Sequence, residues 1–274
     1  MSVTAADIKK LRDMTGAGMM DCKKALNESE GDFDKAIEIL RLKGQKVSAK
    51  RADNEANEGA VVALVSDDKT RGIIVKLSSE TDFVSKNQEF VDGVNAIAAA
   101  ALKAFPASKE ELMEAAIGNS TVASALNDLV TKFTEKMELS YERMEAATVA
   151  PYIHMGNKAA VIVGLSAAGD AVYEAGRDAA MQVAAMKPVA VDENGVDQSI
   201  IDKEIEIGME LARQEGKPEA MLEKIAKGKL NKFFKDNTLM NQMFVKDNKQ
   251  TIADYLNSVE KGLKVTDFKH VTLG

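Results

Sequence analysis

The sequence predicts an α+β fold in which several helical and strand-containing units follow one another along the chain. Three observations indicate this. The first fifty residues place apolar side chains at helical spacing, a β-branched hairpin followed by an alanine-rich helix occurs twice, and a charged helical pair precedes the last strand-like segment. A chain of 274 residues with 45% apolar side chains is long enough for two or more such units.

Residues 1–54 are predicted to form a three-helix module and its linker. Thr4 and Asp7 have the spacing of a capping box, in which a hydroxyl and a carboxylate satisfy free amides at a helix start. Glycines then interrupt the pattern before a second helix, from about Met19 to Asn27. A third helix is expected to end near Gly44, and the polar stretch that follows it is expected to be the linker.

Residues 55–140 are predicted to form a first α+β lobe. The segments Ala60–Val65 and Ile73–Leu77 are rich in β-branched residues and are separated by a polar turn, which is typical of a hairpin. The segment Asn87–Ala104 carries apolar residues on one helical face. The lobe is therefore expected to bury this helix against the hairpin.

Residues 141–190 are predicted to form a second α+β lobe. A strand at Ala159–Leu165 and a helix at Val172–Met186 repeat the plan of the first lobe, offset by roughly 85 to 90 residues. The segment 238–274 contains a helical stretch and a strand-like stretch near Leu263–Leu273. We expect it to return to the body and complete the second lobe.

Residues 191–237 are predicted to form a projecting antiparallel helical hairpin. Helical stretches at Ser199–Gln214 and Glu219–Lys235 are joined by the short loop Gly216–Pro218. Their apolar stripes are narrow, which favours a coiled-coil arm over a buried helix. A homodimer through this arm and an independent hairpin are both compatible with such a stripe.

Composition excludes several classes of function. The formal net charge of −7 argues against binding to nucleic acid, and the basic run Lys43–Arg51 is interpreted as a solvated face or linker. The N-terminus lacks the apolar core of a signal peptide, and no apolar run is long enough to span a membrane. Cys22 is the single cysteine, so no intrachain disulfide can form. We expect a soluble, cytoplasmic protein with no membrane or nucleic-acid partner.

The sequence offers no recognisable catalytic constellation. One cysteine and the two histidines, His154 and His270, are too few for a zinc site of the usual Cys/His type. The glycines of Thr15–Met20 follow a predicted helix where a phosphate-binding loop would follow a strand. Cys22 lies on the inward face of a predicted helix, as a small buried side chain does. We therefore expect no metal, no cofactor and no enzymatic activity.

Two features are unusual for a purely structural protein. Thr81–Val84 joins a strand to a helix and places an aromatic ring beside a carboxylate. Either Phe83 packs into its own lobe and Asp82 caps the next helix, or Phe83 is an anchor for a partner's pocket. Met19 and Met20 point about 100° apart on a helix, so one is expected to face outward, either at the edge of the core or as a contact surface.

The same two segments carry a resemblance to a known family. The run MTGAGMMDCKKAL at Met14–Leu26 resembles the N-terminal signature of the elongation factor Ts family, and TDFV at Thr81–Val84 resembles a second motif of that family. Tyr152, His154 and Gly156 are similar to a further motif. Because these motifs occur in order and at the family's spacing, the resemblance covers essentially the whole chain.

The resemblance implies a nucleotide-exchange factor for elongation factor Tu. In the family, the acid and aromatic of TDFV enter the nucleotide-binding domain of elongation factor Tu and displace the elements that hold magnesium. Asp82 and Phe83, flanked by Thr81 and Val84, match these positions. The resemblance also implies that the N-terminal helices form a module similar to ubiquitin-associated domains.

Further contacts with the partner follow from the same resemblance. Met19, Met20 and Lys23 would lie against the same domain of elongation factor Tu, and His154 and Gly156 would contribute a second-lobe contact. The partner would be bound in its GDP-bound and nucleotide-free states.

The chain departs from the family pattern at three positions. Gln182 stands where many members have histidine, and Met243 replaces a proline that stiffens a loop. Met155 separates His154 from Gly156 and shifts that motif by one residue. Two alternatives to an exchange factor are a general interaction scaffold, for which Asp82 and Phe83 would be dispensable, and an enzyme with a deep polar pocket.

Overall fold

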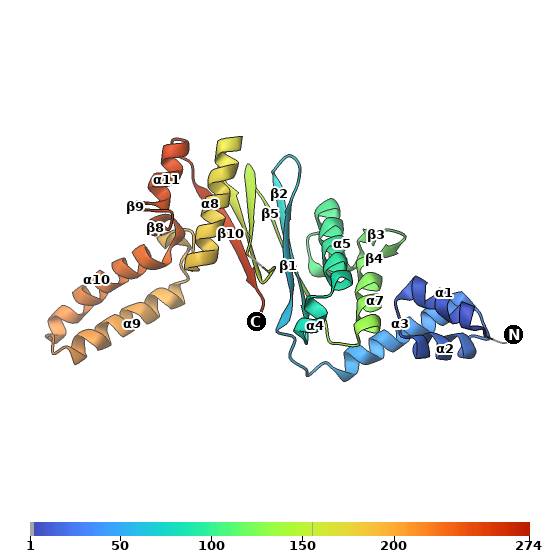
Figure 1. Cartoon of the computed structure of the whole chain (residues 1–274). Helices are drawn as coiled ribbons and strands as arrows, with labels where there is room; N and C mark the ends of the chain where they lie inside the picture. Colours follow the sequence, from blue (N-terminus) through green and yellow to red (C-terminus); the bar gives the residue numbers. More distant parts are fainter. Residues whose placement is uncertain (1–2, 155) are drawn as a thin grey trace.

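The computed structural model describes residues 3–154 and 156–274 of the protein. The molecule is elongated, with three helices at one end, two sheets in the middle and a projecting pair of helices at the other end (Figure 1). Helices are combined with antiparallel sheets, which confirms the predicted α+β class. None of the described helices is long and apolar enough to cross a membrane.

The first three helices share a small core of their own. They are α1 (Ala5–Thr15), α2 (Met19–Glu28) and α3 (Phe33–Lys50). The Thr4–Asp7 capping box at the start of α1 is confirmed, and Cys22 is buried as expected. The core consists of Leu11, Ala17, Cys22, Ala25, Leu26, Ala36 and Leu40. This three-helix unit is therefore held together mainly by small and aliphatic side chains, with the half-buried Phe33 packed against them.

The predicted end of the third helix near Gly44 is wrong, because α3 continues to Lys50. Gly44 lies in the helix interior, against α7 (Val122–Phe133). A Cβ at this position would collide with the side chains of Asn127 and Thr131. The glycine therefore marks a close approach between two helices and not a helix end.

The first sheet contains three antiparallel strands in the order β1-β2-β5. They are β1 (Glu58–Val65), β2 (Arg71–Ser79) and β5 (Glu138–Glu145). Helix α5 (Gln88–Ala104) and α7 cover the outer face and share its core. Smaller elements complete the connections, namely α4 (Asp82–Ser85), α6 (Lys109–Glu114), β3 (Ala116–Ile117) and β4 (Ser120–Thr121).

The second sheet also has three antiparallel strands, in the order β10-β7-β6. They are β6 (Thr148–Ile153), β7 (Ala159–Leu165) and β10 (Val265–Thr272). Helices α8 (Asp170–Met186) and α11 (Ile252–Val259) pack against its outer face. The hairpin of β8 (Met243–Phe244) and β9 (Asp247–Thr251) lies beside them. The last strand of the chain thus returns to pair with β7.

The two sheets pack against each other through their inner faces, so the body has helices outside and sheets inside (Figure 1). The layer between them is formed by Val61, Ala63, Ile74, Met144, Val149, Ala160 and Ile162. The amide of Val61 also donates to the carbonyl of Asn157, 2.8 Å away, and so joins β1 to the β6–β7 turn. The two lobes therefore share one interior.

The projecting helices are α9 (Gln198–Gln214) and α10 (Glu219–Asn237), which lie side by side (Figure 1). They approach most closely at Gly208, where an added Cβ would lie 3.1 Å from the Cα of Ala226. Ala212 and Leu222 are also buried between them. Short one-turn helices, η1 (Glu193–Gly195) and η2 (Leu239–Asn241), connect the pair to the body.

Candidate partner-binding site

The Thr81–Val84 segment forms an exposed tip beyond the end of β2. Its last three residues begin α4, a single turn on which neighbouring side chains point about 100° apart. Val84 is 7% exposed and joins the core of the first lobe, whereas the Phe83 ring is 86% exposed. Phe83 therefore does not pack into its own lobe. The helix that follows, α5, is capped by Asn87 and not by Asp82.

Asp82 presents a charged group beside the Phe83 ring. Its carboxylate accepts a hydrogen bond from Lys86 Nζ at 2.7 Å, one helical turn further on. This hydrogen bond lowers the pKa of Asp82 and raises the pKa of Lys86. Both groups are therefore ionised at neutral pH, and the tip displays an apolar ring next to a surface ion pair.

The base of the tip is bound by Glu135, which follows α7. Its carboxylate accepts the backbone amides of Glu80 and Thr81 at 3.1 Å each, and the Thr81 hydroxyl at 2.6 Å. Sequence reasoning missed Glu135, because its separation of more than fifty residues from the tip leaves no local signal. The contact depends on β5 and β2 being neighbours in the sheet.

Glu80 makes a second set of contacts at the same place. Its carboxylate accepts hydrogen bonds from Arg51 Nη1 at 2.7 and 2.9 Å, from Asn54 Nδ2 at 2.9 Å and from the Lys136 amide at 2.5 Å. Burial alone would raise the pKa of Glu80, but these hydrogen bonds outweigh it and hold the pKa below 4.5. Sequence reasoning missed Glu80 as well, although it directly precedes the motif.

Met19 and Met20 are both exposed at the start of α2. Their exposed fractions are 58% and 66%, so both methionines face outward where one was expected to. Gly18 forms the N-cap, and Lys23 lies exposed one turn later. The opposite face of α2 is buried in the three-helix core. The expected contact residues of this unit therefore form a polarisable apolar surface next to a cation.

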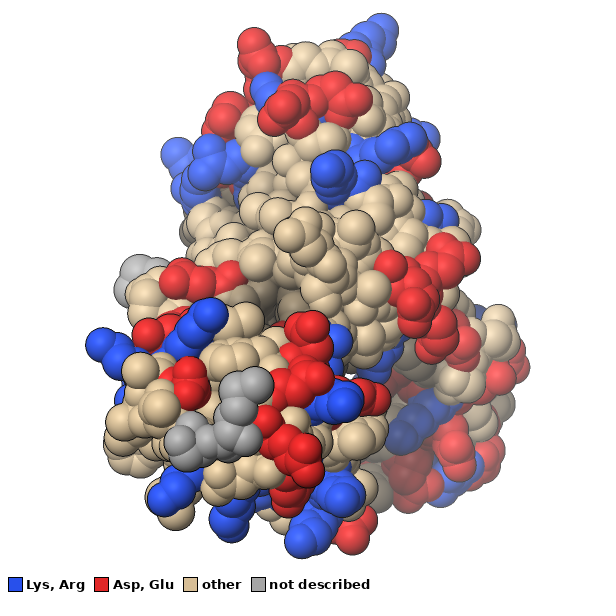
Figure 2. Space-filling view, turned by 90° about the vertical axis from the view of Figure 1, so that its right-hand side faces the viewer, with Lys and Arg blue, Asp and Glu red and all other residues tan. Residues whose placement is uncertain are grey.

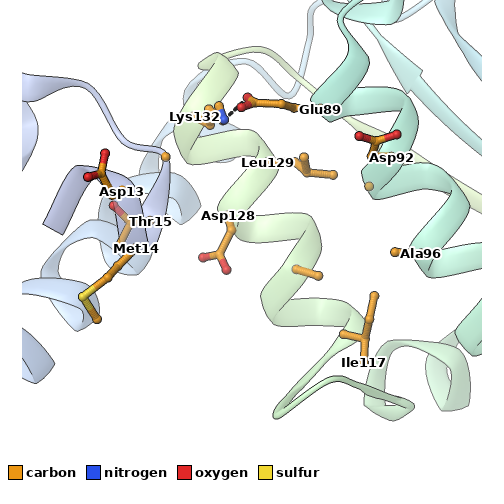
Figure 3. A pocket seen from close by; sticks show the side chains of 13 residues that line it. Asp13, Met14, Thr15, Glu89, Asp92, Ala96, Ile117, Asp128, Leu129 and Lys132 are labelled. Carbon is orange, nitrogen blue, oxygen red and sulfur yellow. Dashed lines mark ion pairs between the residues drawn. The ribbon is translucent and has the colours of Figure 1, made fainter. Parts of the chain in front are cut away.

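A cleft of about 440 Å³ separates the end of α1 from α5 and α7. Figure 3 shows Asp13–Thr15 on one side, α5 with Glu89 on the other, and Asp128 and Lys132 on α7 between them. Lys132 forms an ion pair with Glu89. Burial raises the pKa of Asp128, and the positive charge of Arg41 offsets part of this rise.

The polar lining of the cleft consists mainly of carboxylates with one lysine. Its one hydroxyl, that of Thr15, donates to the carbonyl of Leu11 at 2.8 Å. Among its described lining residues there is no histidine or cysteine to pair with that hydroxyl as a base or replace it as a nucleophile. Within residues 3–154 and 156–274, moreover, no three His, Cys, Asp or Glu side chains are grouped as metal ligands.

The second-lobe residues lie at the β6–β7 turn. His154 is exposed, and its Nδ1 lies 3.4 Å from the Tyr152 hydroxyl. Gly156 has φ +80°, a left-handed conformation that favours glycine. Met155 is outside the described residues. Since the turn is hydrogen-bonded to β1, which begins beside the end of β2, it lies toward the same end of the sheets as the tip.

Gln182 has a structural role that the sequence did not reveal. The side chain is fully buried in α8, and its Nε2 donates to the carbonyl of Met243 at 3.1 Å and to Gln242 Oε1 at 3.2 Å. Its Oε1 accepts the amide of Val245 at 2.9 Å. One amide side chain thus fixes the β8–β9 hairpin to α8. Met243, which stands where the resemblance places a proline, is held by these bonds.

Comparison with known proteins identifies the family of the chain. A family model described as "Elongation factor TS" matches residues 80–274. This range begins at the tip and includes β5 of the first sheet and all three strands of the second. The chain belongs to the elongation factor Ts family. The resemblance seen in the sequence motifs is thereby confirmed.

Relatives named elongation factor Ts match over almost the whole chain. The protein from Christiangramia forsetii is 53% identical over 273 residues, with 99% of each chain covered. That from Flavobacterium psychrophilum is 51% identical over 274 residues, covering 100% of this chain and 99% of the relative. That from Saccharopolyspora erythraea is 44% identical, with 99% and 98% covered. The family relationship therefore includes the three-helix unit.

Proposed function

We propose that this elongation factor Ts family member is a nucleotide-exchange factor that binds elongation factor Tu and promotes release of GDP. The observation that carries the proposal is the Phe83 ring, 86% exposed on a tip whose base is bound from two sides. An exposed aromatic on a fixed support can enter a partner's pocket without much loss of conformational freedom. Asp82 would follow it toward the magnesium site.

The mechanism needs no covalent step. In a GTPase of this kind, the nucleotide is held largely by phosphate, magnesium and backbone contacts. A factor that binds the nucleotide-free conformation more tightly must weaken nucleotide binding by the same ratio. Phe83, acting as an anchor, would contribute about 2 kcal/mol, which corresponds to about thirtyfold in affinity. GTP can then bind to the emptied site.

Two other surfaces would share the binding. Met19, Met20 and Lys23 would contact the nucleotide-binding domain from the three-helix unit, which we take to be of the ubiquitin-associated type. His154 and Gly156 would add a contact from the second lobe. On the face shown in Figure 2, Lys and Arg are interspersed with Asp and Glu, which supports a protein partner over a nucleic acid.

The proposed domain organisation follows the packing. The three-helix unit and linker occupy residues 1–54, and the helical arm occupies 191–237, with 238–274 completing the second lobe. Because β5 pairs with β2, we place the division between the lobes after Glu145, five residues beyond the position expected from the sequence. The arm is taken to be a coiled coil, and whether it pairs with a second copy can be decided by sedimentation at several concentrations.

The direct test is the release of a fluorescent GDP analogue from elongation factor Tu. The protein should accelerate release and hydrolyse no nucleotide itself. Phe83→Ala and Asp82→Ala should both slow release, while circular dichroism and thermal unfolding stay unchanged because both side chains are on the surface. Normal release with both variants would contradict the assignment of the tip, and the scaffold alternative would then be preferred.

A further inference from the structure

Three distant stretches of the chain meet at the base of the Thr81–Val84 tip. They are the linker after α3, the end of β2 and the connection from α7 to β5. Five residues make the contacts, and we call them the loop clamp: Arg51, Asn54, Glu80, Glu135 and Lys136. Figure 1 shows α4 beside the chain that leaves α3 and below the strands of the first sheet.

Glu135 binds donors that the sheet leaves without partners. The β1–β2 ladder ends at the pair Glu58–Ser79, so the amides of Glu80 and Thr81 lie beyond it. Both amides donate to one oxygen of Glu135, and the Thr81 hydroxyl donates to the other. As a result, Thr81 is the N-cap of α4 but makes no side-chain capping bond to it. The direction in which the tip leaves the sheet is therefore set by Glu135.

Glu80 ties the same point to the linker of the three-helix unit. Its side chain is only 14% exposed, and both oxygens receive hydrogen bonds from Arg51. Lys136 strengthens the link from the other side, since its Nζ donates to the carbonyls of Ala52 and Asn54 at 2.7 and 2.9 Å. Hydrogen bonds to ionised, half-buried groups are among the stronger ones in proteins. The linker and the tip are thus one connected structure.

We propose that Glu135 and Glu80 are positioning residues that hold the tip in its projecting conformation, and that Glu80 couples this conformation to the linker of the three-helix unit. The inference rests on the proposed function of Phe83 as the anchor. An anchor loses effectiveness when its support moves, because ordering the support then consumes part of the binding free energy. Neither carboxylate is itself expected to touch the partner.

The first test replaces the carboxylate of Glu135 by an amide of the same shape. Glu135→Gln removes the charge and turns one acceptor into a donor, so the one remaining oxygen can accept either the two amides or the hydroxyl but not all three. We expect the maximal rate of GDP release from elongation factor Tu, measured over a range of factor concentrations, to fall by about tenfold. The matched control is Glu145→Gln, at the far end of β5, the strand that follows the clamp connection, where the carboxylate is paired with exposed Arg71. It should behave like the parent.

The second test asks whether Glu135 acts through Phe83. Glu135→Gln is combined with Phe83→Ala, and its effect should fall to less than about twofold when the ring is already missing. An equal loss in both backgrounds would overturn the inference, as would normal release by Glu135→Gln alone. Normal release by Phe83→Ala would instead refute the proposed function, so the two failures are distinguishable.

A third variant covers the case in which Glu135→Gln fails to fold. Thr81→Val keeps the shape of the side chain and removes only the hydroxyl donor to Glu135. It should reduce the maximal release rate in the same direction, by about threefold, with unchanged circular dichroism. An unchanged rate would count against the clamp.

Discussion

Phe83 and Val84 are neighbours in the chain, yet one is almost fully exposed and the other is buried. Free energy of burial would favour covering the ring, so its exposure needs a cause in the surrounding structure. Neighbouring side chains on α4 diverge by about 100°, so Phe83 points away from the core that Val84 joins. The hydrogen bonds of Glu80 and Thr81 hold the backbone that enters α4 in this orientation. The function proposed for the ring thus depends on polar residues that do not belong to the motif.

The pH dependence of stability follows from Glu80. The pKa of its carboxyl is below 4.5 in the folded protein, so the unfolded chain binds a proton more readily. Its contribution to stability is therefore complete above about pH 4.5 and is lost as the pH falls through the lower folded value. We expect Glu80→Gln to be less stable than the parent at neutral pH, and the difference to shrink below pH 4.5. Urea unfolding at several pH values measures this, and a constant difference would contradict it.

Gln182 provides a second prediction about a single side chain. Gln182→Ala would leave the Val245 amide and the Met243 carbonyl without these partners and would open a small cavity in α8. We expect a loss of about 2 to 4 kcal/mol in the free energy of unfolding. Gln214→Ala, at an exposed site on α9, should change stability by less than about 0.5 kcal/mol. Equal effects of the two substitutions in urea unfolding would show that the buried bonds contribute little.

Helices and strands with strong local patterns were predictable, and their ends and mutual contacts were less so. The strand runs and the helix pair follow from periodicity and turn residues alone. Gly44 misled because glycine has two common roles, ending a helix or admitting a close neighbour, and only the position of α7 decides between them. The loop clamp could not be predicted either, because its contacts also depend on distant parts of the chain. Glu135 and Glu80 are more than fifty residues apart and are brought together by strand pairing.

The close approach of α3 and α7 can be tested at Gly44. In an open helix position, replacing glycine by alanine stabilises a protein by up to about 1 kcal/mol. At Gly44, however, the added methyl would strike Thr131 and Asn127, whose side chains bond to the carbonyls of Leu40 and Arg41.

We therefore expect Gly44→Ala to destabilise the docking of the three-helix unit by about 1 to 3 kcal/mol. Limited proteolysis, followed by mass spectrometry, should show faster cleavage in the linker at residues 51–57. The control is Gly228→Ala in α10, where no atom lies within 4 Å of the added carbon. It should leave the cleavage rate unchanged. If Gly44→Ala were cleaved at the parental rate, the side chains of α7 would have to move aside at little cost in free energy.

The packing of the whole molecule explains why the two similar lobes are not independent. Strands β1 and β7 are almost uninterrupted apolar runs, a pattern typical of strands buried on both faces. The sequence thus held a signal that the sheets pack against each other, although only a repeat of two lobes was predicted from it. The three-helix unit, in contrast, has a separate core, whereas the buried core of the first lobe begins at Ala60 and that of the second at Val161. The α3–α7 contact and the loop clamp both link it to the body.

Two truncations separate these links. Removal of residues 1–50 takes away Met19 and Met20 but keeps the clamp residues Arg51 and Asn54, whereas removal of residues 1–54 takes away all four. Both shortened proteins should lose affinity for elongation factor Tu by a similar factor, because both lack the contact surface on α2. The second should also have a lower maximal rate of GDP release, by about threefold to tenfold, since Glu80 then loses two of its donors. Thermal unfolding verifies that both retain the cores of the lobes. Equal maximal rates would show that the linker does not act on the tip, and that the three-helix unit contributes to exchange only through its own contacts.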